Sequence, residues 1–292
     1  MDAQIFIGKI HIIEWLRDSD RRTGWELFGE VEPMGIVSNP RVDVAFYRVA
    51  TRDAFIDVIR AIENEFRRTS RLPLLHIETH GNDDGIGIAA DNGFTFLELM
   101  EELIPLNGLT GLRLLVVLAA CHGIWGMKMF QPATRSAALA IIGPHRKVDD
   151  DEVARGLQAF YRGMFAHRGG DRAIQEMNDA IKPGEMTFGA LHAELLFKKV
   201  YREFHRQLCT PESIERRLDA MIPEWHAQAR IDFGRDVTDR ELERARALAR
   251  HHLEAHDGNF ADFRRHYFWM DQFPDNEGRF PVTLADCVAD GE

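Results

Sequence analysis

The chain has 292 residues, of which 45% are hydrophobic and 28% are charged. Acidic residues outnumber basic residues by 47 to 36, so the formal net charge is −11. This composition is typical of a soluble globular protein with one large domain or two of ordinary size. The negative charge argues against non-specific binding to nucleic acid or to an anionic membrane, because both need basic surface.

The amino-terminal stretch predicts neither a secretory leader nor a membrane span. It has no basic region ahead of its apolar run, and polar residues interrupt that run. No stretch of about 20 apolar residues follows anywhere in the chain. The three cysteines, Cys121, Cys209 and Cys287, are far apart and odd in number, which argues against a disulfide framework. We therefore expect a cytoplasmic protein with no membrane contact.

The first 189 residues alternate strand and helix patterns. Apolar or alternating runs predict strands over 4–13, 42–49, 72–79, 112–120 and 139–142. Helical spacing or caps predict helices over 52–68, 95–104, 149–168 and 171–182, with a hairpin at 85–93 and a loop or hairpin excursion at 17–40. Strands that alternate with helices predict an α/β fold: a mostly parallel sheet with helices on both faces.

The composition changes near residue 190, where strand patterns stop. The spacing predicts helices over 191–208, 212–230 and 238–256, followed by an irregular tail from residue 273. We therefore expect two domains: an α/β domain over residues 1–189, and an α-helical carboxyl-terminal extension over residues 190–292 that packs on it.

Two of the buried strands end in residues that can carry out chemistry. One ends in His80-Gly81 and the other in Cys121-His122-Gly123. Ligands of parallel sheets bind at the carboxyl ends of the strands, so the imidazole and the thiol are expected at one edge. A thiol beside an imidazole makes a nucleophile and its base. The backbone N–H groups of Gly81 and Cys121 would then bind the oxyanion of a tetrahedral intermediate, worth about 3–4 kcal/mol per donor.

This pair resembles the caspase-like cysteine peptidases of clan CD, above all the bacterial CHAT-domain peptidases. The matching segments are HIETHG at 76–81 and AACHG at 119–123, and the resemblance extends over roughly residues 40–182. In that family a strand ends in His-Gly, and the next core strand ends in the nucleophilic Cys. The resemblance implies a caspase-like fold, with His80 as base and Cys121 as nucleophile.

The resemblance also implies what the enzyme acts on. It implies a thiol protease that needs no metal or other cofactor and cuts a protein or peptide partner at few sites. It further implies a regulatory role of the bacterial defence or cell-death kind, with a protein that activates or regulates the enzyme. Composition and spacing give none of these points.

Four residues are candidates for the substrate pocket. Relatives that cut after Arg or Lys often carry an acid two residues before the Cys, whereas this chain has Ala119. Ala119 therefore favours a small or apolar residue before the scissile bond. Asp83, Asp84 and Asp149 could restore acidity from loops, although Asp83 and Asp84 also suit a turn and Asp149 suits a helix cap.

Two further assignments remain open. Glu78 lies two residues before His80, on the same face of a strand, and could orient the imidazole as carboxylates do in triads. Alternatively, His76, Glu78, His80 and His122 could bind a metal in a metal-dependent hydrolase that uses His76 and His80. The remaining alternative is a catalytically silent caspase-like module whose helical extension binds a partner.

Overall fold

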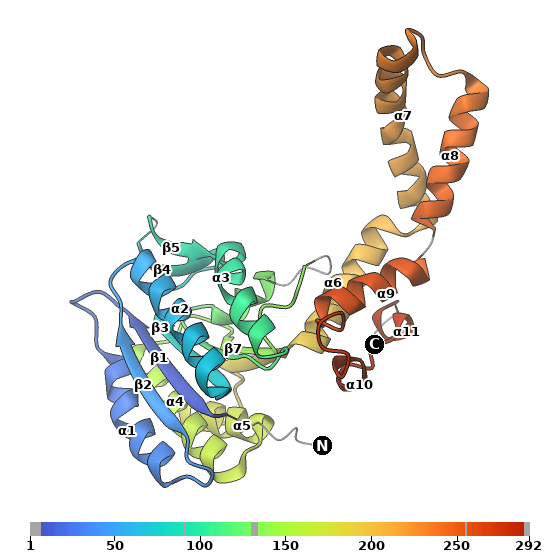
Figure 1. Cartoon of the computed structure of the whole chain (residues 1–292). Helices are drawn as coiled ribbons and strands as arrows, with labels where there is room; N and C mark the ends of the chain where they lie inside the picture. The colour runs from blue at the N-terminus through green and yellow to red at the C-terminus, as the bar shows by residue number, and fades with distance from the viewer. Residues whose placement is uncertain (1–6, 90, 130–133, 255, 289–292) are drawn as a thin grey trace. The chain divides into compact units, whose positions relative to one another are not determined.

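The computed structural model describes residues 7–89, 91–129, 134–254 and 256–288 (Figure 1). It contains a six-stranded sheet with the strand order β2-β1-β3-β6-β7-β8. The first five strands in that order are parallel, and β8 runs antiparallel to β7. Their bounds are β1 (Lys9–Trp15), β2 (Asp43–Arg48), β3 (Pro73–Thr79), β6 (Leu115–Ala119), β7 (Ala140–Pro144) and β8 (Phe188–His192). The predicted α/β class with a mostly parallel sheet is confirmed.

Helices cover both faces of this sheet (Figure 1). One face carries α1 (Thr23–Val37), α4 (Asp150–His167) and α5 (Gly170–Ile181), and the other carries α2 (Arg52–Thr69) and α3 (Phe96–Leu109). On the first face, Ile12, Val117 and Phe160 belong to one buried apolar cluster. On the second, Trp15 stacks on Phe55 with ring centroids 5.5 Å apart. Successive strand residues serve opposite faces, which is why these strands read as continuous apolar runs.

The structure corrects the prediction of a loop or hairpin over residues 17–40, because most of this stretch is helix α1. Leu27 and Val31, one turn apart, are buried against the sheet. Gly35 faces β2 so closely that a methyl group there would overlap the carbonyl oxygen of Val42. Gly35 therefore allows the helix to pack closely on the strand.

The capping patterns identified two helix starts correctly. Thr95 and Glu98 form a complete capping box at α3, and Asp149 and Glu152 form one at α4. The predicted hairpin is also present, as an antiparallel pair of β4 (Gly85–Ala89) and β5 (Asn92–Thr95). After β6 the chain continues into a 3₁₀ helix, η1 (Gly123–Met129).

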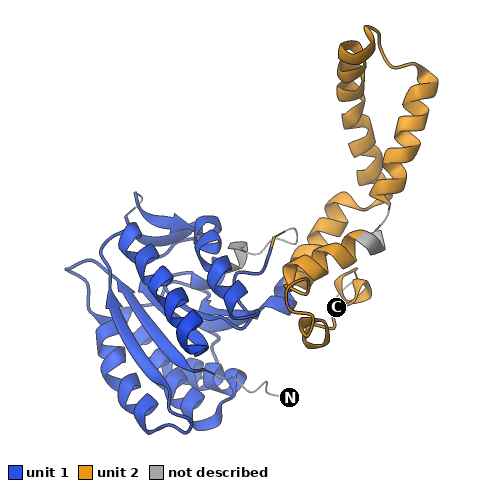
Figure 2. Ribbon diagram, viewed as in Figure 1, with its two compact units in different colours: residues 1–131, 135–196 blue, residues 132–134, 197–292 orange. Residues whose placement is uncertain are grey.

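The chain divides into two compact units, one assigned residues 1–131 and 135–196 and the other residues 132–134 and 197–292 (Figure 2). The boundary predicted between residues 189 and 190 would cut through β8, which pairs with β7. The sequence did not reveal β8, because its five residues follow a turn and lead directly into a helix. The division falls within α6 (Ala193–Leu208).

The second unit is helical, as expected. Beyond α6 it contains α7 (Pro211–Phe233), α8 (Asp239–Leu253), α9 (His256–Tyr267), α10 (Asn276–Arg279) and α11 (Leu284–Val288). Part of the tail predicted to be irregular is therefore short helix. Phe197 is buried and lies 5.0 Å from both Tyr267 and Phe268, measured between ring centroids. None of the described helices combines the length and the apolar character that crossing a bilayer requires.

Candidate active site

The ends of β3 and β6 bring His80 and Cys121 to the same edge of the sheet. The two strands are parallel neighbours, and their register pairs Glu78 with Ala119. His80 and Cys121 each lie two residues beyond this last pair. The backbones also touch, since a methyl group on Gly81 would lie 2.7 Å from the Cys121 carbonyl oxygen and 3.0 Å from the Ala120 Cβ. Residue 81 must therefore be glycine for the two strand ends to approach this closely.

Cys121 lies in a tight turn that begins at the end of β6. The N–H of Gly123 donates to the Ala120 carbonyl at 2.8 Å, and His122 has a φ of 60°. A left-handed residue at the third position is the mark of a type II turn. The Cys121 thiol is partly buried, and its Sγ lies 3.8 Å from the Val148 carbonyl oxygen. The turn thus presents the thiol at the sheet edge without enclosing it.

A carboxylate that the sequence did not single out contacts His80. The imidazole Nε2 donates to Oδ2 of Asp20 over 2.7 Å, and the His80 side chain is 43% exposed. Asp20 lies in the loop after β1, the strand that flanks β3 on the side away from β6. Desolvation raises the pKa of the Asp20 carboxyl, but hydrogen bonds from His80 and from the Arg17 N–H outweigh it and leave that pKa below its ordinary value.

Glu78 does not hold the orienting position that the sequence suggested. Its carboxylate points into the α1 face, where it accepts from the Thr23 hydroxyl and, at 3.1 Å, from Nε2 of His76. Nδ1 of His76 in turn accepts from the Tyr161 hydroxyl at 2.9 Å. Burial raises the pKa of Tyr161 well above its usual value. Glu78 and His76 are therefore parts of a buried polar network, and Asp20 is the carboxylate bonded to His80.

The backbone around Gly81 suits the predicted oxyanion site. Gly81 forms an antiparallel bridge with Ile86 of β4. The two hydrogen bonds of that bridge come from its neighbours: Gly87 donates to the His80 carbonyl and Asn82 donates to the Gly85 carbonyl, both at 3.0 Å. Gly81 is thus the non-hydrogen-bonded member of the pairing, and its own N–H points away from the hairpin. This leaves it available to another acceptor.

A polar cavity of ≈ 530 Å³ opens beside His80. The end of β3, the β4–β5 hairpin and the start of α3 line it, together with Arg17 and Arg52. The Arg52 guanidinium donates to Glu98 at 2.8 Å. The Thr95 backbone N–H, followed by Arg52, lowers the pKa of the Glu98 carboxyl to about 2. Two of the charges in the cavity wall, Arg52 and Glu98, are therefore paired with each other.

The four predicted pocket residues do not form one group. Asp84 lines the cavity together with His80. Asp83 lies 3.4 Å from Nδ1 of His122, measured from its Oδ1. Asp149 caps α4, accepting the Glu152 N–H at 2.8 Å. Ala119 is buried in the apolar cluster of the α1 face. Of the four, only Asp84 shares a cavity with the proposed base.

The metal alternative lacks a ligand set. Over the described ranges, no three His, Cys, Asp or Glu side chains come together in a way that could hold a metal ion. His76 uses both ring nitrogens within the buried network. It lies four residues before His80, a distance of about 13 Å along the strand.

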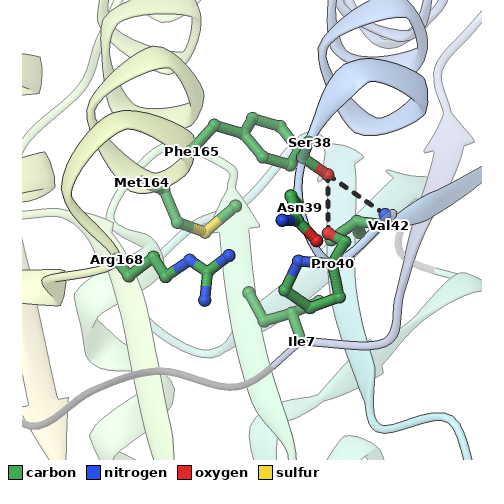
Figure 3. A pocket seen from close by; sticks show the side chains of 8 residues that line it. All are labelled: Ile7, Ser38, Asn39, Pro40, Val42, Met164, Phe165 and Arg168. Atoms are coloured by element: carbon green, nitrogen blue, oxygen red, sulfur yellow. Dashed lines mark hydrogen bonds between the residues drawn. The ribbon is translucent and has the colours of Figure 1, made fainter.

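A second cavity lies at the amino-terminal edge of the sheet, away from His80 (Figure 3). Its volume is ≈ 80 Å³, and the segment before β1, the turn before β2 and the end of α4 line it. The Ser38 hydroxyl donates to the Pro40 carbonyl and accepts the Val42 N–H at this point. The hydroxyl thereby holds the turn before β2 in place. This small cavity is a packing gap between neighbouring elements.

No protein-family model matches this sequence, and no curated protein matches it. The site consists of a thiol and an imidazole on adjacent strand ends, a carboxylate bonded to the imidazole, and a polar cavity beside it.

Proposed function

We propose that this chain is a cysteine peptidase of the caspase-like kind, in which Cys121 is the nucleophile and His80 the general base. The single observation that carries the proposal is the close approach of the Gly81 and Cys121 backbones. It shows that the strand ends carrying His80 and Cys121 are neighbours. The resemblance of segments 76–81 and 119–123 to caspase-like peptidases supports the same assignment.

The proposed reaction has two halves. The Cys121 sulfur attacks the carbonyl carbon of a peptide bond, and His80 accepts the thiol proton. The N–H groups of Gly81 and Cys121 hold the oxyanion of the tetrahedral intermediate. His80 then gives the proton to the leaving amine, the C–N bond breaks, and a thioester to Cys121 remains. Water attacks the thioester, His80 takes its proton and returns it to the sulfur, and the carboxylic acid product leaves.

Regulatory cleavage of a protein partner, in bacterial defence or cell death, follows from the resemblance. The proposal commits to a peptide or protein substrate. We expect the cleavage profile to identify the residue preferred before the scissile bond, because Ala119 lies in the core and, of the four predicted pocket residues, only Asp84 lines the cavity beside His80.

The three thiols differ in a way that makes the proposal testable. Cys209 and Cys287 are buried, whereas Cys121 is only partly buried. Burial raises the pKa of the Cys209 thiol, and burial followed by the Asp286 charge raises that of Cys287 to about 11. Because the thiolate is the reactive form, neither buried cysteine should react at neutral pH.

The deciding experiment incubates the full chain with a peptide library and with a peptide carrying a thiol-directed electrophile. We expect cleavage, and one label located on Cys121 by mass spectrometry. Cys121→Ala and His80→Ala should abolish cleavage. Cys209→Ala, the matched control, should retain both cleavage and labelling.

Two results would contradict the proposal. Cleavage that survives Cys121→Ala but is lost with a chelator would indicate a metal-dependent hydrolase. A folded wild type that neither cleaves the library nor takes the label would indicate the silent interaction module.

A further inference from the structure

The loop between β1 and α1 reaches the imidazole of His80 through one side chain, Asp20. The carboxylate oxygen Oδ2 lies 2.7 Å from Nε2 of His80, and the Asp20 side chain is 22% exposed. A hydrogen bond of this length to a charged acceptor is among the stronger ones that side chains form. It fixes the ring at one of its two nitrogens.

The contact also determines which ring nitrogen can act as a base. An ionised carboxylate only accepts hydrogen bonds, so the proton of a neutral His80 must sit on Nε2. Nδ1 then carries the lone pair. No hydrogen bond from a described residue reaches Nδ1, so its lone pair is free to accept a proton. The orienting groups of histidine bases work in this way in general.

Asp20 is itself held in place. Its Oδ2 also accepts the backbone N–H of Arg17 at 2.8 Å. The Arg17 guanidinium donates to the Ile88 carbonyl at 3.0 and 3.2 Å, which ties the loop to the β4–β5 hairpin. Arg21 anchors the other end of the loop on Glu26 and on Asp151, at 2.7 and 2.6 Å. Because the loop is tied at both ends, Asp20 is preorganised before any substrate arrives.

We propose that Asp20 is the positioning residue of the site, which fixes the orientation and tautomer of His80 so that Nδ1 is the proton acceptor. This inference rests on the proposed cysteine peptidase function for its kinetic consequence, but the tautomer itself does not depend on catalysis. Asp20 is bonded to His80 and to the Arg17 N–H, so we expect its effect on the reaction to pass through His80.

The charged groups around this pair come from three elements. Arg17 lies on the same loop, Asp84 lines the cavity with His80, and the Asp83–His122 pair lies where the ends of β3 and β6 meet. Asp20 is the one among them bonded to the ring. Its replacement should therefore have an effect that replacement of a neighbouring carboxylate does not.

The test compares Asp20→Asn with Asp18→Asn as a matched control. Asp18 lies on the same loop, its side chain is 98% exposed, and it pairs with Arg48 rather than with His80. For Asp20→Asn we expect kcat to fall about 100-fold with little change in KM, because the base is misplaced while the binding surface is intact. Asp18→Asn should stay within about twofold of wild type, and Asp20→Glu, which keeps the charge, should recover part of the loss.

Nitrogen NMR of the His80 ring supplies the readout that does not need activity. Wild type should show a protonated Nε2 and an unprotonated Nδ1 above the titration range of the ring, and Asp20→Asn should show a mixture of tautomers. If the tautomer and kcat of Asp20→Asn both match wild type, the inference is wrong although the peptidase proposal stands. If wild type shows the expected tautomer but no cleavage, the peptidase proposal fails and the role of Asp20 in positioning the ring remains.

Discussion

Replacing Gly81 by Ala tests whether the close approach of the two strand ends is needed. The new methyl group would lie 2.7 Å from the Cys121 carbonyl oxygen, 3.0 Å from the Ala120 Cβ and 3.6 Å from the Cys121 nitrogen. The first contact is shorter than real contacts of this kind and is to backbone that cannot rotate away, and the second is tight. The strand ends must therefore separate by about half an ångström, and overpacking of this kind costs about 1–3 kcal/mol.

The measurement has two parts. Urea denaturation should show the free energy of unfolding lowered by about 1–3 kcal/mol. Labelling of Cys121 and peptide cleavage should fall by about 10–100-fold, because a displacement of this size moves the proposed base relative to the proposed nucleophile.

Gly29→Ala is the matched control. Gly29 lies on the exposed side of α1 with nothing within 4 Å of an added methyl group. There alanine should raise the free energy of unfolding by about 0.5–1 kcal/mol, since glycine is the poorer helix former. A Gly81→Ala protein that is as stable and as active as wild type would refute the reasoning, because it would mean that the strand ends need not touch.

Two further predictions concern pH. Burial, followed by the nearby Lys9 charge, lowers the pKa of His11 from 6.5 to about 4, so stability should fall by at most about 3 kcal/mol as the pH drops from 6.5 to 4. His11→Phe should lack this slope in thermal unfolding, and an unchanged slope would show that His11 does not cause it. The bond from Arg146, which outweighs desolvation, lowers the pKa of Glu152 from 4.5 to about 2, so its contribution is present above pH 4.5 and is lost as the pH falls towards 2. The melting temperatures of wild type and Glu152→Gln should therefore differ at pH 6 and converge with acidification; a constant difference would contradict this.

Local sequence patterns were sufficient to predict most strands of the sheet and the residues at which they end. The apolar runs that became β3 and β6 are patterns of neighbouring residues, as are the capping boxes at Thr95 and Asp149. His80-Gly81 and Cys121 follow two such runs directly. Because parallel strands align their carboxyl ends, strand order alone then brings these residues to one edge.

Tertiary structure decided what depends on residues far apart in the chain. Helix α1 forms despite its glycines and proline because Leu27 and Val31 are buried against the sheet. Helix propensity, which is a local property, does not include this tertiary stabilisation. The partner of His80 lies 60 residues away, in a loop whose position is set by the order of β1 and β3. Glu78 had the right spacing to contact His80, but its carboxylate is hydrogen-bonded to the buried Thr23 and His76 instead. The sequence thus located the thiol and the imidazole at two strand ends, because periodicity is a local property. Only the fold shows which carboxylate contacts the imidazole, because a hydrogen bond requires proximity in space.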